Sequence, residues 1–148
     1  MKRTFIATSI LLCLFTGCIS KTETVKTNNA DIVIPLEHDY NEVKDFDLTW
    51  DCIFEVERNE YYVYIYSTSC SHCIEIKNLM IETALQRKDI YFIKGSSKDN
   101  IANDSDLPKN AENPGEIWIL GYPTLLKIVN KTCVKNLAGK SEILDELK

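Results

Sequence analysis

The sequence predicts one α/β domain with a central mixed sheet of four to five strands flanked by helices. Two patterns lead to this expectation. Residues 61–93 read as strand, helix and strand, and a helical crossover of this kind joins parallel strands. Residues 125–137 read as a hairpin, whose two strands are antiparallel. A sheet that contains both kinds of pairing is mixed.

The strand–helix–strand unit is the clearer of the two patterns. Residues 61–66 are a continuous β-branched and aromatic run, which is typical of a strand buried on both faces. Polar residues end this run, and apolar residues then recur at helical spacing between residues 76 and 84. Residues 90–93 form the second apolar run, and we expect them to pair in parallel with the first.

The flanking segments complete the domain. Residues 47–56 have the apolar spacing of a short amphipathic helix. In the hairpin, residues 125–129 and 132–137 are the two strands, and Asn130-Lys131 forms the turn. A last helix follows Gly139.

The N-terminus has the pattern of an export signal. Lys2 and Arg3 precede about a dozen mostly apolar residues, too few for a bilayer core that needs roughly 20. We therefore expect residues 1–17 to be a signal peptide. Residues 14–18 (Leu-Phe-Thr-Gly-Cys) resemble the lipobox of bacterial lipoproteins, which implies that Cys18 is lipidated and becomes the new N-terminus. The alternative is an ordinary secretory leader in which Cys18 has no such role.

The expected location follows from this leader. Residues 18–30 are rich in Lys, Thr and Asn without periodicity, which predicts a flexible tether ahead of a domain over residues 31–148. A diacylglyceryl group at Cys18 supplies two chains, enough for stable anchoring. We expect a lipid-anchored protein on the extracytoplasmic face of the cell membrane, where its cysteines meet an oxidising or redox-variable compartment.

The charge balance argues against one class of partner. The chain carries 17 Lys and Arg against 22 Asp and Glu, a net charge of −5. Nucleic-acid binding favours clustered basic residues, so we expect no nucleic-acid partner. We expect the protein to be a monomer.

Cys70 and Cys73 enclose the strongest motif, a Cys-Ser-His-Cys placed between the buried strand and the helix. A C-x-x-C is either a redox pair, half of a zinc site or an inert structural disulfide. A zinc site needs three or four protein ligands, and the remaining cysteines and histidines do not repeat the paired spacing. The strand–helix–strand context favours the redox pair, and we expect no metal.

The position of the motif suggests a role for each residue. Cys70 would lie at the helix N-terminus, where unpaired N–H groups and the helix dipole favour a negative sulfur, the species that attacks disulfides. Cys73, one turn later and more buried, would then resolve the mixed disulfide. The imidazole of His72 would further stabilise the Cys70 thiolate, making the disulfide form more oxidising; the alternative is a solvated side chain. The expected catalytic residues are Cys70, Cys73 and His72.

Together with a later Gly-Tyr-Pro-Thr at residues 121–124, this layout resembles the thioredoxin superfamily over roughly residues 47–148. The resemblance implies the thioredoxin fold and a cis Pro123 that faces the C-x-x-C. It also implies that Tyr122 and Pro123 help to bind substrate, because the backbone before the proline pairs with the substrate chain. With its export signal, the chain further resembles extracellular thioredoxin-like lipoproteins and bacteriocin-accessory proteins of Gram-positive bacteria.

Two departures from the family leave questions open. The motif resembles the Cys-Pro-His-Cys of periplasmic disulfide oxidases, but Ser71 replaces the proline, so the redox direction stays open. Tyr64 occupies the position of a buried acidic residue in thioredoxins. The acceptor of the Cys73 proton is therefore open between bulk water, a backbone-held water and Glu75.

Cys52 and Cys133 have two alternative interpretations. Each is either a small core hydrophobe or half of a second disulfide in an exported domain. The distance between Cys52 and Cys133 in the folded protein decides between a disulfide and two separate core residues.

These observations predict an exported, membrane-anchored thiol–disulfide oxidoreductase that acts on protein dithiols and disulfides. No organic cofactor is expected, because the electrons reside on the two sulfurs, and a separate redox partner must reset the pair. Two alternatives stay open. One is a non-catalytic thioredoxin-fold accessory module that binds a partner in a secretion or bacteriocin transport system, and the other is metal delivery.

Overall fold

The computed structural model describes residues 37–96, 99–103, 107 and 110–148. The expected signal peptide (1–17), the Cys18 lipidation site and the tether (18–30) lie outside the described residues. Among the residues that are described, no helix combines the length and the apolar composition that a membrane span requires.

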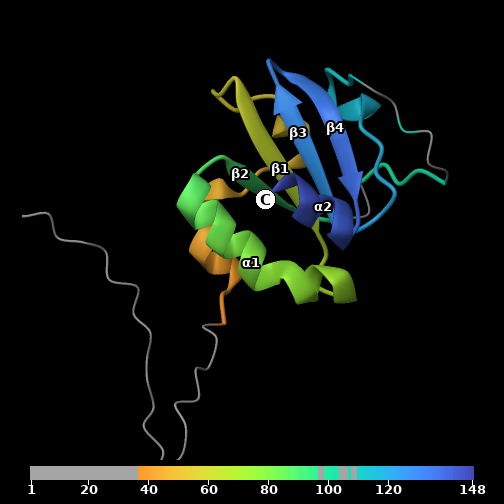
Figure 1. Cartoon of the computed structure of the whole chain (residues 1–148). Helices are drawn as coiled ribbons and strands as arrows, with labels where there is room; N and C mark the ends of the chain where they lie inside the picture. Colours follow the sequence, from red (N-terminus) through yellow and green to blue (C-terminus); the bar gives the residue numbers. More distant parts are fainter. Residues whose placement is uncertain (1–36, 97–98, 104–106, 108–109) are drawn as a thin grey trace, which may run out of the picture. The chain divides into compact units, whose positions relative to one another are not determined.

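The sheet is mixed, as the sequence predicts. Its four strands in the described part of the chain are β1 (Glu60–Tyr66), β2 (Ile90–Lys94), β3 (Thr124–Val129) and β4 (Thr132–Ala138). They lie in the order β2-β1-β3-β4 (Figure 1). β1 pairs in parallel with β2 and antiparallel with β3, and β3 pairs antiparallel with β4. The parallel pair and the hairpin are both confirmed.

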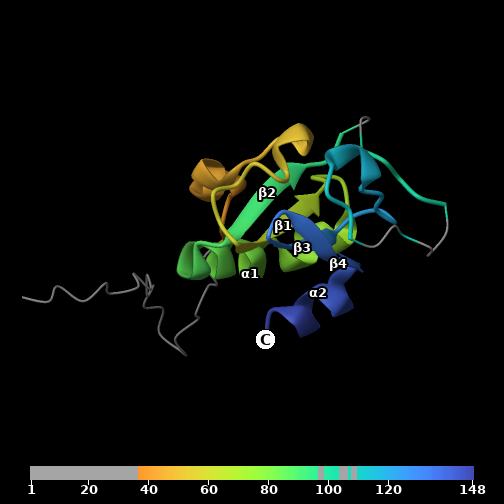
Figure 2. The same cartoon turned by 90° about the horizontal axis from the view of Figure 1, so that it is seen from above.

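Two α-helices cover one face of this sheet (Figure 2). Helix α1 (Ser71–Arg87) forms the crossover between the parallel strands, and α2 (Lys140–Glu146) follows β4. Three short 3₁₀ helices complete the described elements: η1 (Tyr40–Phe46), η2 (Trp50–Cys52) and η3 (Pro114–Glu116).

The side chains of β1 alternate between two hydrophobic cores. Tyr62, Tyr64 and Tyr66 face the helices and pack with apolar residues of α1, α2 and η1. Tyr61, Val63 and Ile65 face the opposite side, against the segments around η2 and η3. This two-sided burial explains why the strand is a continuous apolar run rather than an alternating one.

The segment before β1 corrects one expectation. The predicted helix over residues 47–56 is only the three-residue η2. Asp47 instead forms a bridge with Phe92, and the Leu48 N–H donates to the Phe92 carbonyl at 2.8 Å. The chain pairs with the outer edge of β2, and this backbone pairing replaces the first turn of the expected helix.

Helix η1 was not expected from the sequence. Its start carries a capping box, in which Asp39 accepts backbone N–H bonds and Glu42 accepts the Asp39 N–H at 2.6 Å. Val43 is its buried residue, and Tyr40 packs beside β1. The capping residues are visible in the sequence, but the apolar content around them is low, and the packing against α1 stabilises the element.

Candidate redox site

Cys70 lies at the junction between β1 and α1, where it caps the helix. Its backbone is extended (φ −86°, ψ 121°), and its sulfur accepts a hydrogen bond from the Cys73 N–H at 3.3 Å. The chain reaches this position through a turn in which the Cys70 N–H donates to the Ser67 carbonyl. The sulfur therefore lies at the positive end of the helix, where a negative charge is stabilised.

Cys73 lies one turn further along α1 and is only 1% exposed. Burial, and secondarily the neighbouring Cys70, raises the pKa of its thiol to about 12. Cys73 is thus a neutral thiol near neutral pH, whereas Cys70 is half-exposed. This difference in exposure fits the roles that the sequence predicts, in which Cys70 reacts with the partner and the buried Cys73 resolves the mixed disulfide.

The loop before β3 brings Tyr122 and Pro123 against the motif. The Tyr122–Pro123 peptide bond is cis, as expected. The Cys70 thiol donates a hydrogen bond to the Tyr122 carbonyl at 3.3 Å. The backbone before the proline therefore contacts the half-buried sulfur directly, although the two residues are 52 positions apart.

The Tyr122 side chain is held by residues that sequence reasoning missed. Its hydroxyl donates to the Asp99 carboxylate at 2.6 Å, and that carboxylate also accepts the Ser96 N–H at 3.1 Å. The end of the ring lies against Gly95, so a Cβ built at residue 95 would stand 2.5 Å from the Tyr122 hydroxyl oxygen. The one available sequence signal was a glycine directly after a strand, which marks close approach of another group.

Among the described residues, the His72 side chain shares no hydrogen bond or ion pair with Cys70. Its side chain is 63% exposed, and its Nδ1 lies 3.7 Å from Glu75. The predicted tuning of the Cys70 thiolate would therefore act through solvent-screened electrostatics, and it stays a prediction.

Glu75 does not fit the role of proton acceptor for Cys73. It lies on the exposed side of α1 and forms an ion pair with Lys140 of α2. This hydrogen bond and charge lower the pKa of the Glu75 carboxyl. A carboxylate stabilised in this way on the surface is a poor base for a thiol buried on the opposite side of the helix.

Cys52 and Cys133 are separate free thiols in this structure, as are Cys70 and Cys73. Cys133 is buried in the core opposite the helices, its sulfur donates to the Lys135 carbonyl at 3.3 Å, and burial raises its pKa to about 11. It is a core residue, in line with the first of the two interpretations. Across the described residues, three or more His, Cys, Asp or Glu side chains nowhere gather in a group able to hold a metal ion.

Comparisons with known proteins give structural matches only. Neither a protein-family model nor a curated protein matches the chain. Spinach chloroplast thioredoxin f is 14% identical with a TM-score of 0.48, and the match covers 77% of this chain and 96% of that one. Chlamydomonas reinhardtii thioredoxin f2 is 20% identical with a TM-score of 0.44, over 69% and 91% of the two chains. Plasmodium falciparum thioredoxin is 18% identical with a TM-score of 0.44, over 68% and 93%.

The fold itself rests on the topology. The helical crossover after β1 and the hairpin followed by α2 are the arrangement that the sequence predicts, and the structure adds the strand order β2-β1-β3-β4. The C-x-x-C lies where β1 gives way to α1, and the loop before β3 faces it. The described part of the chain has the thioredoxin fold.

Proposed function

We propose that the protein is a thiol–disulfide oxidoreductase whose redox centre is the Cys70–Cys73 pair. One observation carries the proposal: the Cys70 sulfur is held between the Cys73 N–H and the Tyr122 carbonyl, each at 3.3 Å. This places a half-exposed sulfur at a helix N-terminus and a second, buried thiol one turn behind it. The two sulfurs thus differ in their exposure to a partner, and a two-step exchange requires this difference.

The reaction runs in two steps when the pair starts reduced. The Cys70 thiolate attacks a partner disulfide, forms a mixed disulfide and releases one partner sulfur as a thiolate. Cys73 then loses its proton and attacks the Cys70 sulfur, the bond to the partner breaks, and the second partner sulfur leaves. The partner gains two electrons and the Cys70–Cys73 pair loses two. The same steps in reverse introduce a disulfide into a partner dithiol.

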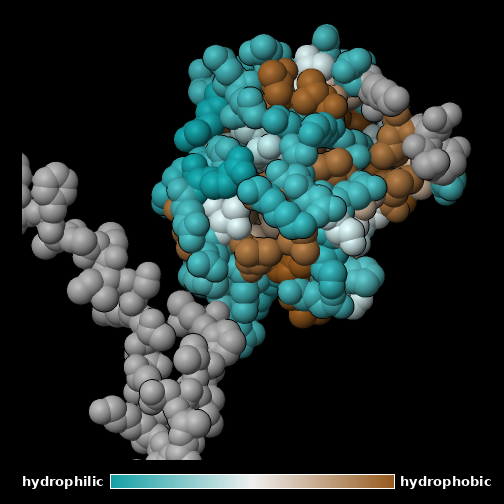
Figure 3. Space-filling view, viewed as in Figure 1, coloured by the Kyte–Doolittle hydropathy of each residue, from teal (hydrophilic) through white to brown (hydrophobic). Residues whose placement is uncertain are grey.

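The surface beside Cys70 supports a protein as the partner. Ile74, one turn along α1, and Leu120, two residues before Tyr122, are large hydrophobic side chains that lie exposed. On the face seen in Figure 3, hydrophobic residues reach the surface as separate patches within a largely hydrophilic surface. Exposed apolar side chains on the two segments that meet at the Cys70 sulfur favour a polypeptide over a small polar thiol as the partner.

Export and lipid anchoring at Cys18 are part of this proposal and rest on the leader of the sequence. Mass spectrometry of the chain from membranes of a bacterial host that processes lipoproteins should show a lipidated N-terminal Cys18. The Cys18→Ser variant should leave the membrane fraction. An unmodified Cys18 in a membrane-free product would refute the anchor and leave the redox proposal intact.

Activity is tested with the purified full-length chain and two protein substrates, one carrying an exposed disulfide and one reduced and unfolded. Wild-type protein should catalyse at least one of the two conversions, and the Cys70→Ser variant neither. The reduction potential of the pair sets the direction: near −120 mV, roughly, it acts as an oxidant, and near about −270 mV as a reductant. A wild-type chain that catalyses neither conversion would overturn the proposal.

A further inference from the structure

Among the described residues, the Tyr64 hydroxyl is one of two buried side-chain polar atoms without a hydrogen-bond partner, the other being Asn136 Oδ1. Tyr64 is 0% exposed, and within the described residues its hydroxyl oxygen has no partner in hydrogen-bonding geometry. The adjacent Tyr61 is equally buried, but its hydroxyl donates to the Ile53 carbonyl at 2.7 Å. Burying an unpaired hydroxyl is costly, since it loses its bonds to water without replacement. A buried hydroxyl without a hydrogen-bond partner is uncommon in native proteins, and its presence calls for a functional or structural explanation.

The residues around Tyr64 suggest a functional explanation for its unpaired hydroxyl. It belongs to the core that contains Cys73, on the side of the sheet that faces α1. The Tyr64 hydroxyl helps to lower the pKa of Cys73 and of Tyr40, against the larger effect of burial, and both groups in turn raise its own pKa. The Tyr64 hydroxyl thus influences both the buried thiol and Tyr40, which packs against the same core.

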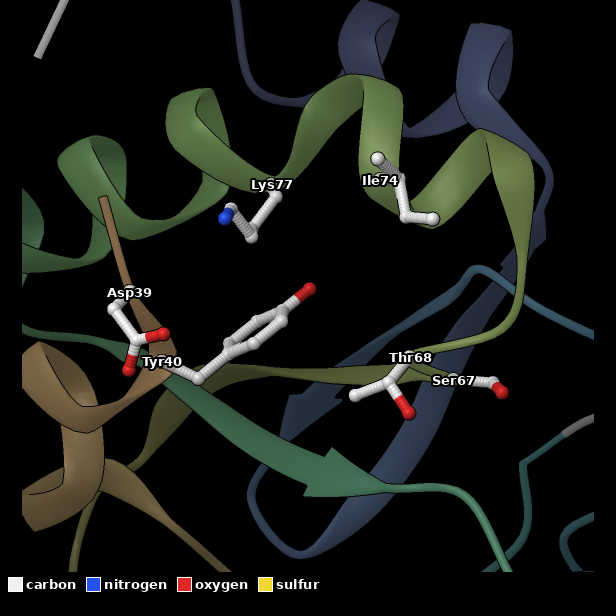
Figure 4. A pocket seen from close by; sticks show the side chains of 6 residues that line it. All are labelled: Asp39, Tyr40, Ser67, Thr68, Ile74 and Lys77. Atoms are coloured by element: carbon white, nitrogen blue, oxygen red, sulfur yellow. The ribbon is translucent and has the colours of Figure 1, made fainter. Parts of the chain in front are cut away.

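Tyr40 connects this buried group to the surface. Its ring stacks on that of Tyr66, with centroids 3.8 Å apart, which holds it beside the end of β1. It also lines a pocket of about 220 Å³ between η1, the start of α1 and the turn after β1 (Figure 4). In that view the Tyr40 hydroxyl points toward the end of α1 that carries Ile74. The pocket is large enough for several water molecules, and exposed residues at its rim open it to solvent.

We propose that Tyr64 and Tyr40 form a proton relay that carries the Cys73 proton to solvent when the mixed disulfide is resolved. This inference rests on the proposed redox function and answers which group accepts that proton. Bulk water has little access to a thiol that is 1% exposed, and Glu75 is held on the surface by Lys140. In the proposed relay, Tyr64 accepts the proton of the reacting thiol, and Tyr40 passes a proton on to solvent.

The step balances in protons and electrons. The Cys73 proton moves to the Tyr64 oxygen, the Tyr64 proton moves to the Tyr40 oxygen, and the Tyr40 proton moves to a water in the pocket. Each tyrosine gains one proton as it loses another, so neither becomes a buried anion, which their raised pKa values forbid. The Cys73 electron pair forms the bond to the Cys70 sulfur, and the pair of the broken bond leaves on the partner thiolate.

The test separates the two chemical steps with an aromatic disulfide whose thiolate product absorbs visible light. Reduced full-length protein carrying Cys13→Ser, Cys18→Ser and Cys52→Ser serves as the wild-type background, because these thiols would also react with the reagent. Mixed with the reagent in a stopped-flow instrument, it releases one thiolate when Cys70 attacks and a second when Cys73 resolves. Tyr64→Phe should leave the first rate within about twofold of wild type and slow the second about tenfold or more. Tyr40→Phe should also slow the second step, because Tyr64 is fully buried and Tyr40 is the member of the pair that lines the pocket.

Tyr61→Phe is the matched control, since it removes an equally buried hydroxyl from the opposite face of β1. It should change neither rate, and it should lower stability because the Ile53 carbonyl loses its donor. Tyr64→Phe should instead raise the urea midpoint, since it removes an unpaired polar atom. A purely structural role for the Tyr64 hydroxyl would move the midpoint and not the ratio of the two rates.

The outcomes are distinct. If Tyr64→Phe resolves the mixed disulfide at the rate of Tyr61→Phe, the relay is wrong and the redox function stands. If wild-type protein releases only the first thiolate, the redox proposal itself fails. Circular dichroism of each variant verifies that the fold is retained.

Discussion

The two faces of the sheet each bury a cysteine and a tyrosine, with different consequences. On the side of α1, the pair is Cys73 and Tyr64; on the side of η2 and η3, it is Cys133 and Tyr61. Burial raises the pKa of both thiols, to about 12 for Cys73 and about 11 for Cys133. A raised thiol pKa therefore does not distinguish the candidate redox residue from the core residue.

The neighbours of each thiol make the distinction. Cys133 donates to the Lys135 carbonyl and Tyr61 to the Ile53 carbonyl, so both polar groups on that face are satisfied within the core. Cys73 lies behind Cys70, whose sulfur accepts its N–H, and beside a hydroxyl that no described residue satisfies. The comparison teaches that what distinguishes Cys73 from Cys133 is the second, more accessible sulfur next to it, and not its burial.

The largest expected effect comes from Cys70. Cys70→Ser should reduce exchange activity by about 10³-fold or more, because the attacking sulfur is gone and a hydroxyl is a far weaker nucleophile. Cys133→Ala should retain wild-type activity, measured with the same disulfide-bonded protein substrate. Equal losses in the two variants would mean that both faces take part in the chemistry.

Cys73→Ser sharpens the comparison by stopping the reaction halfway. Cys70 should still attack, and the mixed disulfide should accumulate because the resolving sulfur is absent. Mass spectrometry under non-reducing conditions should detect one partner per chain, linked to Cys70. If the partner is instead found on Cys52, the assignment of Cys70 as the attacking residue fails.

A smaller loss of activity is expected when the residue that packs against the Tyr122 ring is changed. Gly95→Ala places a methyl group where the end of the Tyr122 ring lies, so the ring must move and the bond to Asp99 is lost. The Tyr122 carbonyl then shifts relative to Cys70, and kcat/KM should fall roughly three- to tenfold, as for a small displacement of a positioning group. Gly115→Ala is the control, because a Cβ there meets no atom within 4 Å. Similar kinetics for the two variants would remove Gly95 from the site.

The smallest effect is a loss of stability in alkali that both faces share. The thiols of Cys73 and Cys133 have an ordinary pKa of 9.0 that rises to about 12 and about 11, and that of Tyr61 rises from 10.0 to about 12. Above about pH 9 the unfolded chain releases these protons while the folded chain keeps them, so the free energy of unfolding decreases as pH rises. Below pH 9 these groups contribute no slope.

Urea midpoints measured in steps between about pH 8 and 11 check this expectation. Cys133→Ala should reduce the slope, since it removes one of the groups. A midpoint that is constant over this interval would contradict the raised pKa values on both faces.

Much of the site was predictable because it is local in sequence. The strand, the C-x-x-C and the helix are contiguous, so periodicity and adjacency place Cys70 at a helix N-terminus and Cys73 one turn inside it. The role of Tyr122-Pro123 came from the family resemblance, since nothing in the spacing of the chain links residue 122 to residue 70. The prediction of a helix over residues 47–56 was wrong because its first two residues pair with the edge of β2 instead.

The sequence by itself determined the α/β class, the mixed sheet and the place of the C-x-x-C between strand and helix, because hydrophobic periodicity and turn residues act over a few neighbouring positions. Only the tertiary structure decided which groups surround the two sulfurs. The Tyr122–Asp99 bond, the close approach of Gly95 and the placement of Tyr40 beside Tyr66 join positions more than twenty residues apart. Such contacts depend on how the elements pack, and local patterns carry no information about them.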